Sequence, residues 1–173
     1  MLRLFTKTLK TGIVTETIKQ PDAAELEALG IEVKCRIDHY FSGSLAIRAV
    51  DAGSCNGCEL EIHALNNPVY DVERYGIHFV ASPRHADILL VTGPVSRHMQ
   101  TALLRTYEAT PNPKWVIAVG DCAVCGGEFG VSYACCGAVA NVIPVDVVIP
   151  GCPPTPETLV KGLLGLMKRS GAD

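Results

Sequence analysis

The sequence predicts one α/β domain built on a doubly wound, flavodoxin-like parallel sheet, with an arm at its N-terminus. Short runs rich in leucine, valine and isoleucine recur from Leu45 onwards, as they do in strands that are buried on both faces. Segments long enough for crossover helices separate several of these runs. The 173 residues fit a single domain, and no internal repeat or domain linker interrupts them.

Residues 1–44 are expected to form the arm, because they mix polar and apolar residues without the pattern of a buried strand. Within the arm, residues 22–29 predict a short helix that ends at Gly30, since glycine suits a helix C-terminus. The α/β domain then occupies residues 45–173.

Five strands and three helices are expected in this domain. The strands are predicted at residues 45–50, 77–81, 88–92, 115–119 and 145–149. The helices are predicted at residues 59–65, 97–107 and 156–168. The last helix has the clearest start, because Thr155 can cap it, Pro156 suits its first position and Glu157 complements the positive end of its dipole.

The composition predicts a domain that partner subunits cover and that neither spans a membrane nor binds nucleic acid. Hydrophobic residues make up 48% of the chain and charged residues 19%, which is apolar for a soluble domain. The apolar runs at residues 88–91 and 115–119 are far shorter than the ~20 residues of a membrane-spanning helix. The net charge is −3 and no basic stripe interleaves with aromatic residues, so nucleic acid is not an expected partner.

Eight cysteines in a chain with no secretory signal predict metal binding or redox chemistry. The basic start is followed by threonine and lysine, not by the apolar stretch and cleavage site of a signal peptide. In a reducing compartment thiols stay free, so a disulfide framework is not expected.

Three cysteine-bearing loops each follow a predicted strand. Cys55 lies five residues after the first strand, and Cys122 and Cys152 each lie three residues after the fourth and fifth strands. Loops that follow parallel strands leave the sheet at the same edge, where open α/β sheets bind their ligands. Cysteines nearly a hundred residues apart along the chain are therefore expected to converge.

The converging cysteines predict an iron-sulfur cluster. Cys55 and Cys58 supply two thiolates from one loop, and Cys122 and Cys152 complete a set of four, the number that holds such clusters. Glycines surround each loop, so backbone amides can approach the cluster and hydrogen-bond its sulfides.

Other assignments of the cysteines stay open at this point. Cys55 and Cys58 alone also fit half of a zinc site or a thioredoxin-like redox pair. Cys125 forms a second pair with Cys122 at the same spacing and is an alternative to Cys152 as the fourth ligand. The remaining three, Cys35, Cys135 and Cys136, are interpreted as small buried apolar residues.

Four motifs are recognisable as a set: GSCNGCELEI, SPRHADILLVTGPVSRHM, PKWVIAVGDCAVCGG and IPVDVVIPGCPPTPE. They resemble the small subunit of membrane-bound nickel-iron hydrogenases, most of all the formate hydrogenlyase type. They are also similar to the twenty-kilodalton subunit of respiratory complex I, and the likeness runs from about Asp51 to Met167.

The resemblance implies one 4Fe-4S cluster held by Cys55, Cys58, Cys122 and Cys152, in agreement with the convergence argument. It implies that Cys125 lies beside the cluster without binding it, since many relatives have a small residue there. The spacing of Cys55 and Cys58 favours hydrogenases, because complex I subunits have adjacent cysteines in this loop. The cysteine-rich half that carries two further clusters in larger uptake hydrogenases is missing, so one cluster is expected.

The resemblance also implies the partners. A large catalytic subunit carries the nickel-iron centre in hydrogenases and forms the quinone pocket in complex I, so no active-site metal is expected on this chain. A ferredoxin-like iron-sulfur subunit and membrane subunits complete such a complex. The chain is then expected at the cytoplasmic side of the cell membrane, held peripherally through those subunits.

Glu61 is the residue expected to act in proton transfer, because it resembles the glutamate that follows the cysteine pair in complex I relatives. Glu59 is the rival candidate. The plainer interpretation of Glu61 is a solvated carboxylate near the start of a helix, where the dipole favours negative charge.

The sequence thus predicts an oxidoreductase subunit that transfers electrons next to the catalytic subunit of a nickel-iron hydrogenase-like complex. One alternative is a complex I-like or sulfur-reducing oxidoreductase without hydrogenase activity, which uses the same cluster. A second alternative, from a different class, is a zinc-stabilised interaction module with no role in electron transfer.

Overall fold

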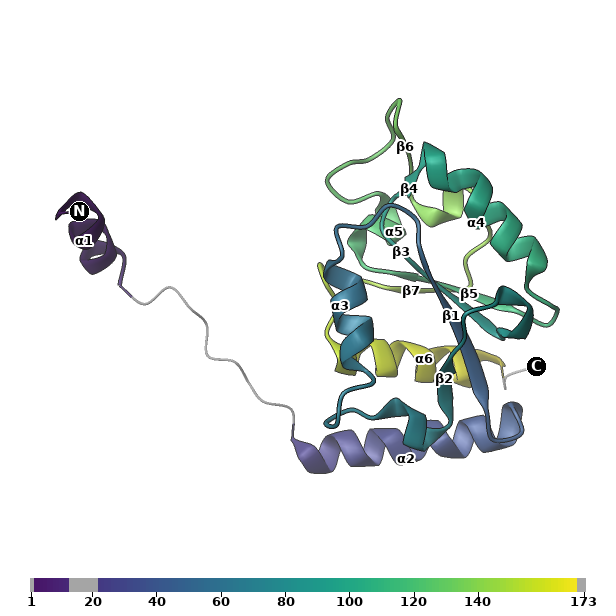
Figure 1. The fold of residues 1–173 in the computed structure, drawn as a ribbon. Coiled ribbons are helices and arrows are strands. Elements are labelled where there is room, and N and C mark those ends of the chain that lie inside the picture. Colours follow the sequence, from purple (N-terminus) through teal and green to yellow (C-terminus); the bar gives the residue numbers. More distant parts are fainter. Residues whose placement is uncertain (1, 13–21, 171–173) are drawn as a thin grey trace.

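A five-stranded parallel sheet forms the centre of the domain in the computed structural model, which describes residues 2–12 and 22–170 (Figure 1). Its strand order is β2-β1-β3-β5-β7. The strands are β1 (Leu45–Asp51), β2 (Ile77–Phe79), β3 (Ile88–Thr92), β5 (Trp115–Val119) and β7 (Val147–Ile149). This is the strand order of the flavodoxin-like doubly wound fold, so the predicted fold class is confirmed.

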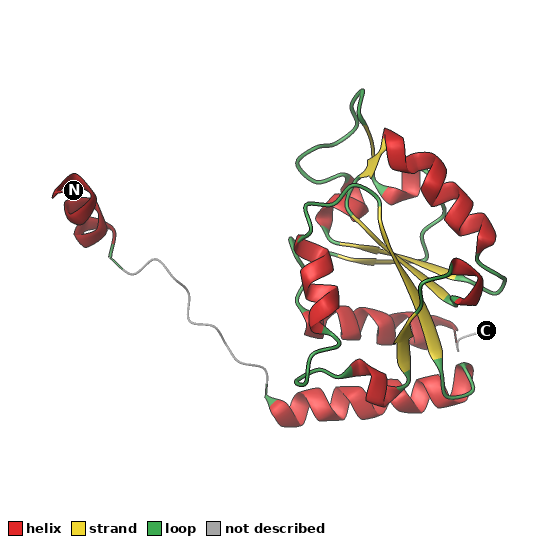
Figure 2. Cartoon of the chain, viewed as in Figure 1, coloured by secondary structure: helices red, strands yellow, loops and turns green. Residues whose placement is uncertain are grey.

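Helices cover both faces of the sheet (Figure 2). One face packs against α2 (Ala23–Tyr40), α3 (Gly57–Ala64) and α6 (Pro156–Ser170), and the other against α4 (Arg97–Ala109) and α5 (Asp121–Cys125). Alternate residues of β3 serve the two cores: Ile88 and Leu90 point to the first, and Leu89 and Val91 to the second. Burial on both faces explains why this strand is apolar from Ile88 to Val91.

The helix expected at residues 22–29 is longer than predicted. It starts after Asp22, whose side chain accepts a hydrogen bond from the backbone N–H of Ala24, and continues past Gly30 to Tyr40. Gly30 is wrong as a helix end because it lies in the helix interior against the Tyr75 ring, where a Cβ would come within 2.1 Å of a ring carbon. Its lack of a side chain serves packing.

The expected arm contains two helices, α1 (Leu2–Thr11) and α2, while residues 1 and 13–21 lie outside the described residues. Val33 and Ile37 of α2 are fully buried in the same core as the sheet. The division of the chain between residues 44 and 45 stays a prediction about domain organisation.

Several short elements were not predicted. A two-stranded antiparallel sheet pairs β4 (Val95–Ser96) with β6 (Cys135–Gly137). Short 3-10 helices occur at η1 (Val72–Tyr75), η2 (Pro83–His85) and η3 (Val139–Asn141). These elements and α5 are too short to show a periodic pattern in sequence.

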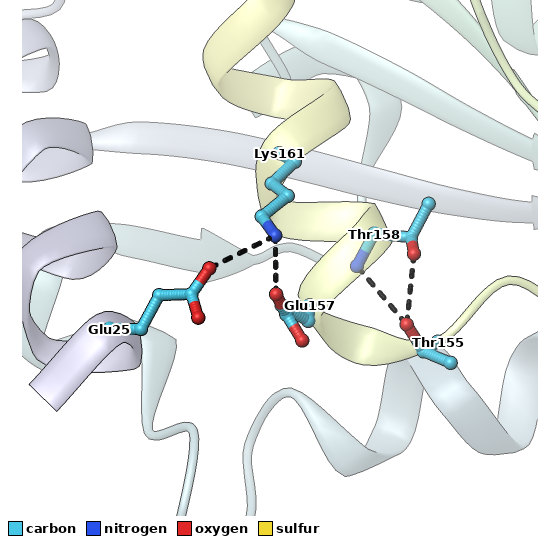
Figure 3. Close-up of polar contacts among 5 residues, drawn as sticks. All are labelled: Glu25, Thr155, Glu157, Thr158 and Lys161. Atoms are coloured by element: carbon cyan, nitrogen blue, oxygen red, sulfur yellow. Dashed lines mark hydrogen bonds and ion pairs between the residues drawn. The ribbon is translucent and has the colours of Figure 1, made fainter. Parts of the chain in front are cut away.

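The start of α6 is as predicted. The Thr155 hydroxyl accepts a hydrogen bond from the backbone N–H of Thr158 (Figure 3). Lys161 forms an ion pair with Glu157, which lies one turn earlier in the same helix. Lys161 also lies 3.6 Å from Glu25, so this ion-pair cluster joins α6 to α2. In the described part of the chain, no helix has both the length and the apolar character needed to cross a membrane.

Candidate functional site

The structure brings the four predicted ligand cysteines to one cavity at the carboxyl edge of the sheet. Their loops follow β1, β5 and β7. All four side chains, Cys55, Cys58, Cys122 and Cys152, line a cavity of about 130 Å³. The three loops therefore converge as the parallel sheet requires.

The four thiols differ in their exposure. Cys58 is buried, with 9% of its surface exposed, and Cys122 is half-buried, whereas Cys55 and Cys152 are exposed. Burial raises the pKa of the Cys58 thiol to about 11, and the carboxylate of Glu59 and the three neighbouring thiols add to the rise. Burial also raises the pKa of Cys122, with Cys152 and Cys55 next in effect. The thiols thus interact electrostatically, and the cavity is most open beside Cys55 and Cys152.

Hydrogen bonds shape the first cysteine loop locally. The Asp51 carboxylate accepts bonds from the backbone N–H groups of Gly53 and Ser54, at 2.8 and 2.7 Å. The Ser54 hydroxyl accepts a bond of 3.0 Å from the backbone N–H of Asn56, which has a left-handed conformation. The chain then enters α3, so Cys58 lies in the first turn of a helix.

Glu59 ties this loop to the neighbouring strand. Its carboxylate accepts a 2.6 Å hydrogen bond from the Ser54 hydroxyl and another from the hydroxyl of Thr92 at the end of β3. The sequence analysis ranked Glu59 behind Glu61 because Glu61 resembles the glutamate of complex I relatives. The contact of Glu59 to Thr92 spans 33 residues and leaves no local signal in the sequence.

Asp121 joins the other two cysteine loops. Its backbone N–H donates to the Gly151 carbonyl at 2.9 Å, and its carboxylate accepts from the Gly151 N–H at 2.8 Å. Asp121 precedes Cys122 and Gly151 precedes Cys152, so these bonds fix one thiol relative to the other. The sequence analysis missed Asp121. The available signal was an acidic residue directly before a cysteine in a glycine-rich loop.

Glycines leave room for the sulfur atoms. A Cβ on Gly120 would lie 2.6 Å from the Sγ of Cys58, and one on Gly127 would lie 2.7 Å from the Sγ of Cys122. Both residues also have a positive φ, at +84° and +53°, which side chains other than glycine rarely adopt. The thiols are thus surrounded by bare backbone.

The donor set and its surroundings fit an iron-sulfur cluster. Four cysteine thiols from glycine-rich loops are the ligands that such clusters take, and nearby backbone amides can hydrogen-bond the sulfides. Among the residues that the structure describes, no three His, Cys, Asp or Glu groups form a site for a single metal ion.

The remaining predicted residues lie outside this cavity lining. Glu61 is half-buried on α3, one turn after Cys58, and adds with Glu157 to the raised pKa of Tyr70, for which burial is the main cause. Cys125 is exposed, and its Sγ lies 3.1 Å from the Asp121 carbonyl oxygen.

The three cysteines interpreted as buried apolar residues divide into two groups. Cys135 and Cys136 are buried in β6, as expected. The expectation is wrong for Cys35, which is exposed on α2 because the core-facing positions of that helix are taken by Val33 and Ile37.

Comparisons with known proteins agree with this architecture. Residues 55–166 match the family model described as NADH ubiquinone oxidoreductase, 20 Kd subunit. The chain is 48% identical over 157 residues to formate hydrogenlyase subunit 7 of Escherichia coli (strain K12), covering 83% of this chain and 62% of that protein. It is 50% identical over 115 residues to the probable membrane-bound hydrogenase subunit mbhJ of Pyrococcus furiosus, covering 66% of this chain and 69% of that protein.

A solved structure extends the likeness to three dimensions. It is the membrane-bound sulfane sulfur reductase (MBS), an archaeal respiratory membrane complex, one chain of which matches with a TM-score of 0.65 at 36% identity. The match covers 80% of this chain and 74% of that chain. The chain spans less than two thirds of the length of formate hydrogenlyase subunit 7, at 62%. On the match over residues 55–166, the chain belongs to the family of the 20 kDa subunit of NADH ubiquinone oxidoreductase.

Proposed function

We propose that the chain is the electron-transfer subunit of a membrane-bound nickel-iron hydrogenase-like complex and that Cys55, Cys58, Cys122 and Cys152 hold one 4Fe-4S cluster. The observation that carries the proposal is the meeting of these four thiols, from three separate loops, around a single cavity. When bound, such a cluster supplies one-electron redox chemistry. The four cysteines would hold the cluster, and the buried position of Cys58 would keep water away from that side of it. The glycine-rich loops offer backbone amides as hydrogen-bond donors to the sulfides.

The relatives support an electron-transfer role within a complex I-like or hydrogenase-like membrane assembly. They include a formate hydrogenlyase subunit and a probable membrane-bound hydrogenase subunit. We infer a large partner subunit that carries the nickel-iron centre, a ferredoxin-like iron-sulfur subunit that exchanges electrons with this chain, and membrane subunits. The chain then lies peripherally at the cytoplasmic side of the membrane.

An exposed apolar loop beside the site supports a covering partner. The segment between α5 and β6 projects from the domain near the helix that carries Cys122 (Figure 1). Its large side chains are exposed to 63% at Phe129, 71% at Val131 and 98% at Tyr133. Apolar groups gathered on a surface in this way mark protein interaction sites. A subunit seated on this loop lies next to the thiols.

A second candidate is a complex I-like or sulfur-reducing complex without hydrogenase activity. The similarity to a chain of the sulfane sulfur reductase complex favours it. Both candidates use the same electron-carrying residues, because the site that distinguishes them belongs to the partner.

Glu61 is proposed to serve proton transfer near the cluster. It lies three residues after Cys58 on α3, so the two share a face of the helix. In the purified complex, Glu61→Gln is expected to slow proton-coupled turnover while leaving the cluster's reduction by dithionite unchanged. Wild-type turnover in this variant would assign Glu61 to the solvated surface.

Anaerobic purification of the whole complex through a tag on this chain tests the proposed function. We expect a large chain to co-purify with nickel, and hydrogen to reduce the iron-sulfur signal of this chain. A large chain without nickel supports the second candidate. Zinc in place of iron on this chain contradicts both, because neither candidate then has its electron carrier.

A further inference from the structure

The first helix, α1 (Leu2–Thr11, purple in Figure 1), contributes none of its described residues to the two cores of the domain. The side chains that the structure describes in it, Arg3 and residues 6–11, are all exposed. The helix has ten residues, fewer than the ~12–15 that an isolated helix needs to persist in water. A surface outside the domain therefore has to stabilise it.

The apolar residues of α1 gather on one side of the helix. Leu2, Phe5 and Leu9 follow one another at intervals of three and four residues, which places them on one face. Leu9 is 73% exposed, so nothing in the domain covers its end of this face. An apolar helix face in water is unfavourable, and burial elsewhere would stabilise it.

The basic residues of α1 gather on another side. Arg3, Lys7 and Lys10 are also spaced by four and three residues, and none of them belongs to an ion pair of the described chain. The helix has no acidic residue, so its charge is +3. Because the whole chain has 15 basic and 18 acidic residues, the remainder has 12 and 18 and a net charge of −6.

The glutamates of the neighbouring helix α2 are already paired within the domain. Glu25 lies beside Lys161, Glu27 beside Arg74 and Glu32 beside Lys168. These ion pairs reduce the attraction that the acidic side chains of α2 would exert on α1. The partner that complements the charge of α1 is thus expected outside this chain.

Two threonines of α1 have hydroxyl groups that are bonded within the helix. The Thr6 hydroxyl donates a 3.1 Å hydrogen bond to the Arg3 carbonyl, and the Thr11 hydroxyl donates one of 2.7 Å to the Lys7 carbonyl. A hydroxyl that has such a partner can leave water at lower cost than one without. These residues therefore do not oppose burial of the helix at an apolar boundary.

We propose that α1 lies in the surface of an anionic phospholipid bilayer, with its apolar face towards the acyl chains and its basic face at the headgroup phosphates. Separate apolar and Lys/Arg-rich faces are what helices in the membrane interface present. Such a surface offers apolar and anionic groups side by side, so it matches both faces of α1 at once. This contact goes beyond the proposed function, in which partner subunits hold the chain at the membrane.

Sedimentation of the whole isolated chain with lipid vesicles tests the contact. One set of vesicles contains phosphatidylcholine alone, and the other contains equal parts of phosphatidylcholine and phosphatidylglycerol. Binding should be about a hundredfold stronger to the mixed vesicles, because each basic residue near an anionic surface contributes about fivefold. Added salt should reduce this difference. Equal binding to both kinds of vesicle, or to neither, overturns the proposal.

Substitutions assign the binding to the basic face. Lys7→Gln combined with Lys10→Gln should weaken binding to the mixed vesicles about thirtyfold. Lys34→Gln is the matched control, because it removes an exposed lysine of α2, and it should bind like the wild type. Binding of the double variant at the wild-type level would mean that another surface binds the lipid, and it overturns the proposal.

A second pair of variants tests the apolar face. Leu9→Gln should weaken binding to the mixed vesicles several-fold, because the residue no longer transfers apolar surface out of water. Ile31→Gln changes a residue of α2 that is 58% exposed, and it should leave binding unchanged. Equal binding by Leu9→Gln and the wild type contradicts insertion of this face.

Purification of the complex separates lipid from a protein partner. If the isolated chain binds no vesicles while the α1 variants are lost from the complex, α1 binds an acidic protein surface and the proposal is wrong. The vesicle measurements need neither iron nor nickel. Their failure therefore leaves the proposed electron-transfer role untouched, and a chain without iron that still binds anionic vesicles rejects only that role.

Discussion

The carboxylate of Asp121 accepts a 2.8 Å hydrogen bond from the backbone N–H of Gly151, thirty residues further along the chain. This bond joins the loop that carries Cys122 to the loop that carries Cys152. Glu59 in turn holds the first cysteine loop to the end of β3. Hydrogen bonds of two carboxylates thus help to position three loops that lie far apart in the sequence. The arrangement of the four thiols thus depends on two acidic residues that each lie next to a predicted ligand cysteine in the sequence.

Removing the Asp121 carboxylate should loosen the site. Asp121→Ala is expected to release iron to a chelator several-fold faster than the wild type, because the loss of a charge-assisted hydrogen bond costs about 1.5–3 kcal/mol. Asp121→Asn keeps an acceptor oxygen and should release iron at a rate near that of the wild type. Equal rates for Asp121→Ala and the wild type would contradict the role given to this bond.

A single methyl group beside the thiols should prevent cluster assembly. Gly120→Ala places a Cβ 2.6 Å from the Sγ of Cys58 and forces a residue with a side chain to adopt a φ of +84°. Reconstitution with iron and sulfide should therefore yield little of the wild-type visible absorption. Gly165→Ala is the matched control, since no atom lies within 4 Å of the added Cβ in α6. A control that fails, or a Gly120 variant that assembles normally, would weaken the assigned geometry.

The cluster-free chain should lose stability in alkaline solution. Burial, with Glu59 and the other thiols, raises the pKa of Cys58 from 9.0 to about 11. The folded state then holds this proton more tightly than the unfolded state, so the contribution is complete below pH 9 and falls as the pH rises towards 11. Urea unfolding across this range should show a steeper decline for the wild type than for Cys58→Ala. Parallel curves for the two proteins would exclude the raised pKa.

Gly30 should be irreplaceable despite its position in a helix. Helix propensity alone predicts that Gly30→Ala stabilises the chain by about 1 kcal/mol. The added Cβ would however lie 2.1 Å from the Tyr75 ring, so we expect destabilisation of about 1–3 kcal/mol by overpacking. Urea unfolding measures the difference, and a gain in stability would mean that Tyr75 moves aside freely.

The sheet and the cysteine site could be predicted because their signals are local. Strands β3 and β5 have the bounds expected from sequence, since burial on both faces makes them apolar, apart from Thr92 at the end of β3. Convergence of Cys55, Cys122 and Cys152 follows from one rule of parallel sheets, and the four thiols do line one cavity.

The errors arise where tertiary contacts outweigh local preference. Glycine is typical of a helix end, but Gly30 packs against the ring of Tyr75, which is 45 residues away in the sequence. Glu59 has its defining contact with Thr92, and Asp121 has its own with Gly151. Each of these partners can be identified only once the strand order of the sheet is known, because that order brings the loops together.

Iron and acid-labile sulfide analysis of the anaerobically purified chain tests whether the four cysteines hold a 4Fe-4S cluster. About four iron and four sulfide ions per chain are expected in the wild type. Cys152→Ser should lose most of the reduced-state paramagnetic signal, whereas Cys35→Ser, which changes an exposed cysteine on α2, should keep both the signal and the iron content. A wild-type chain that contains one zinc ion and no iron, or a Cys152→Ser variant with an intact cluster, would contradict the assignment of the four cysteines as its ligands.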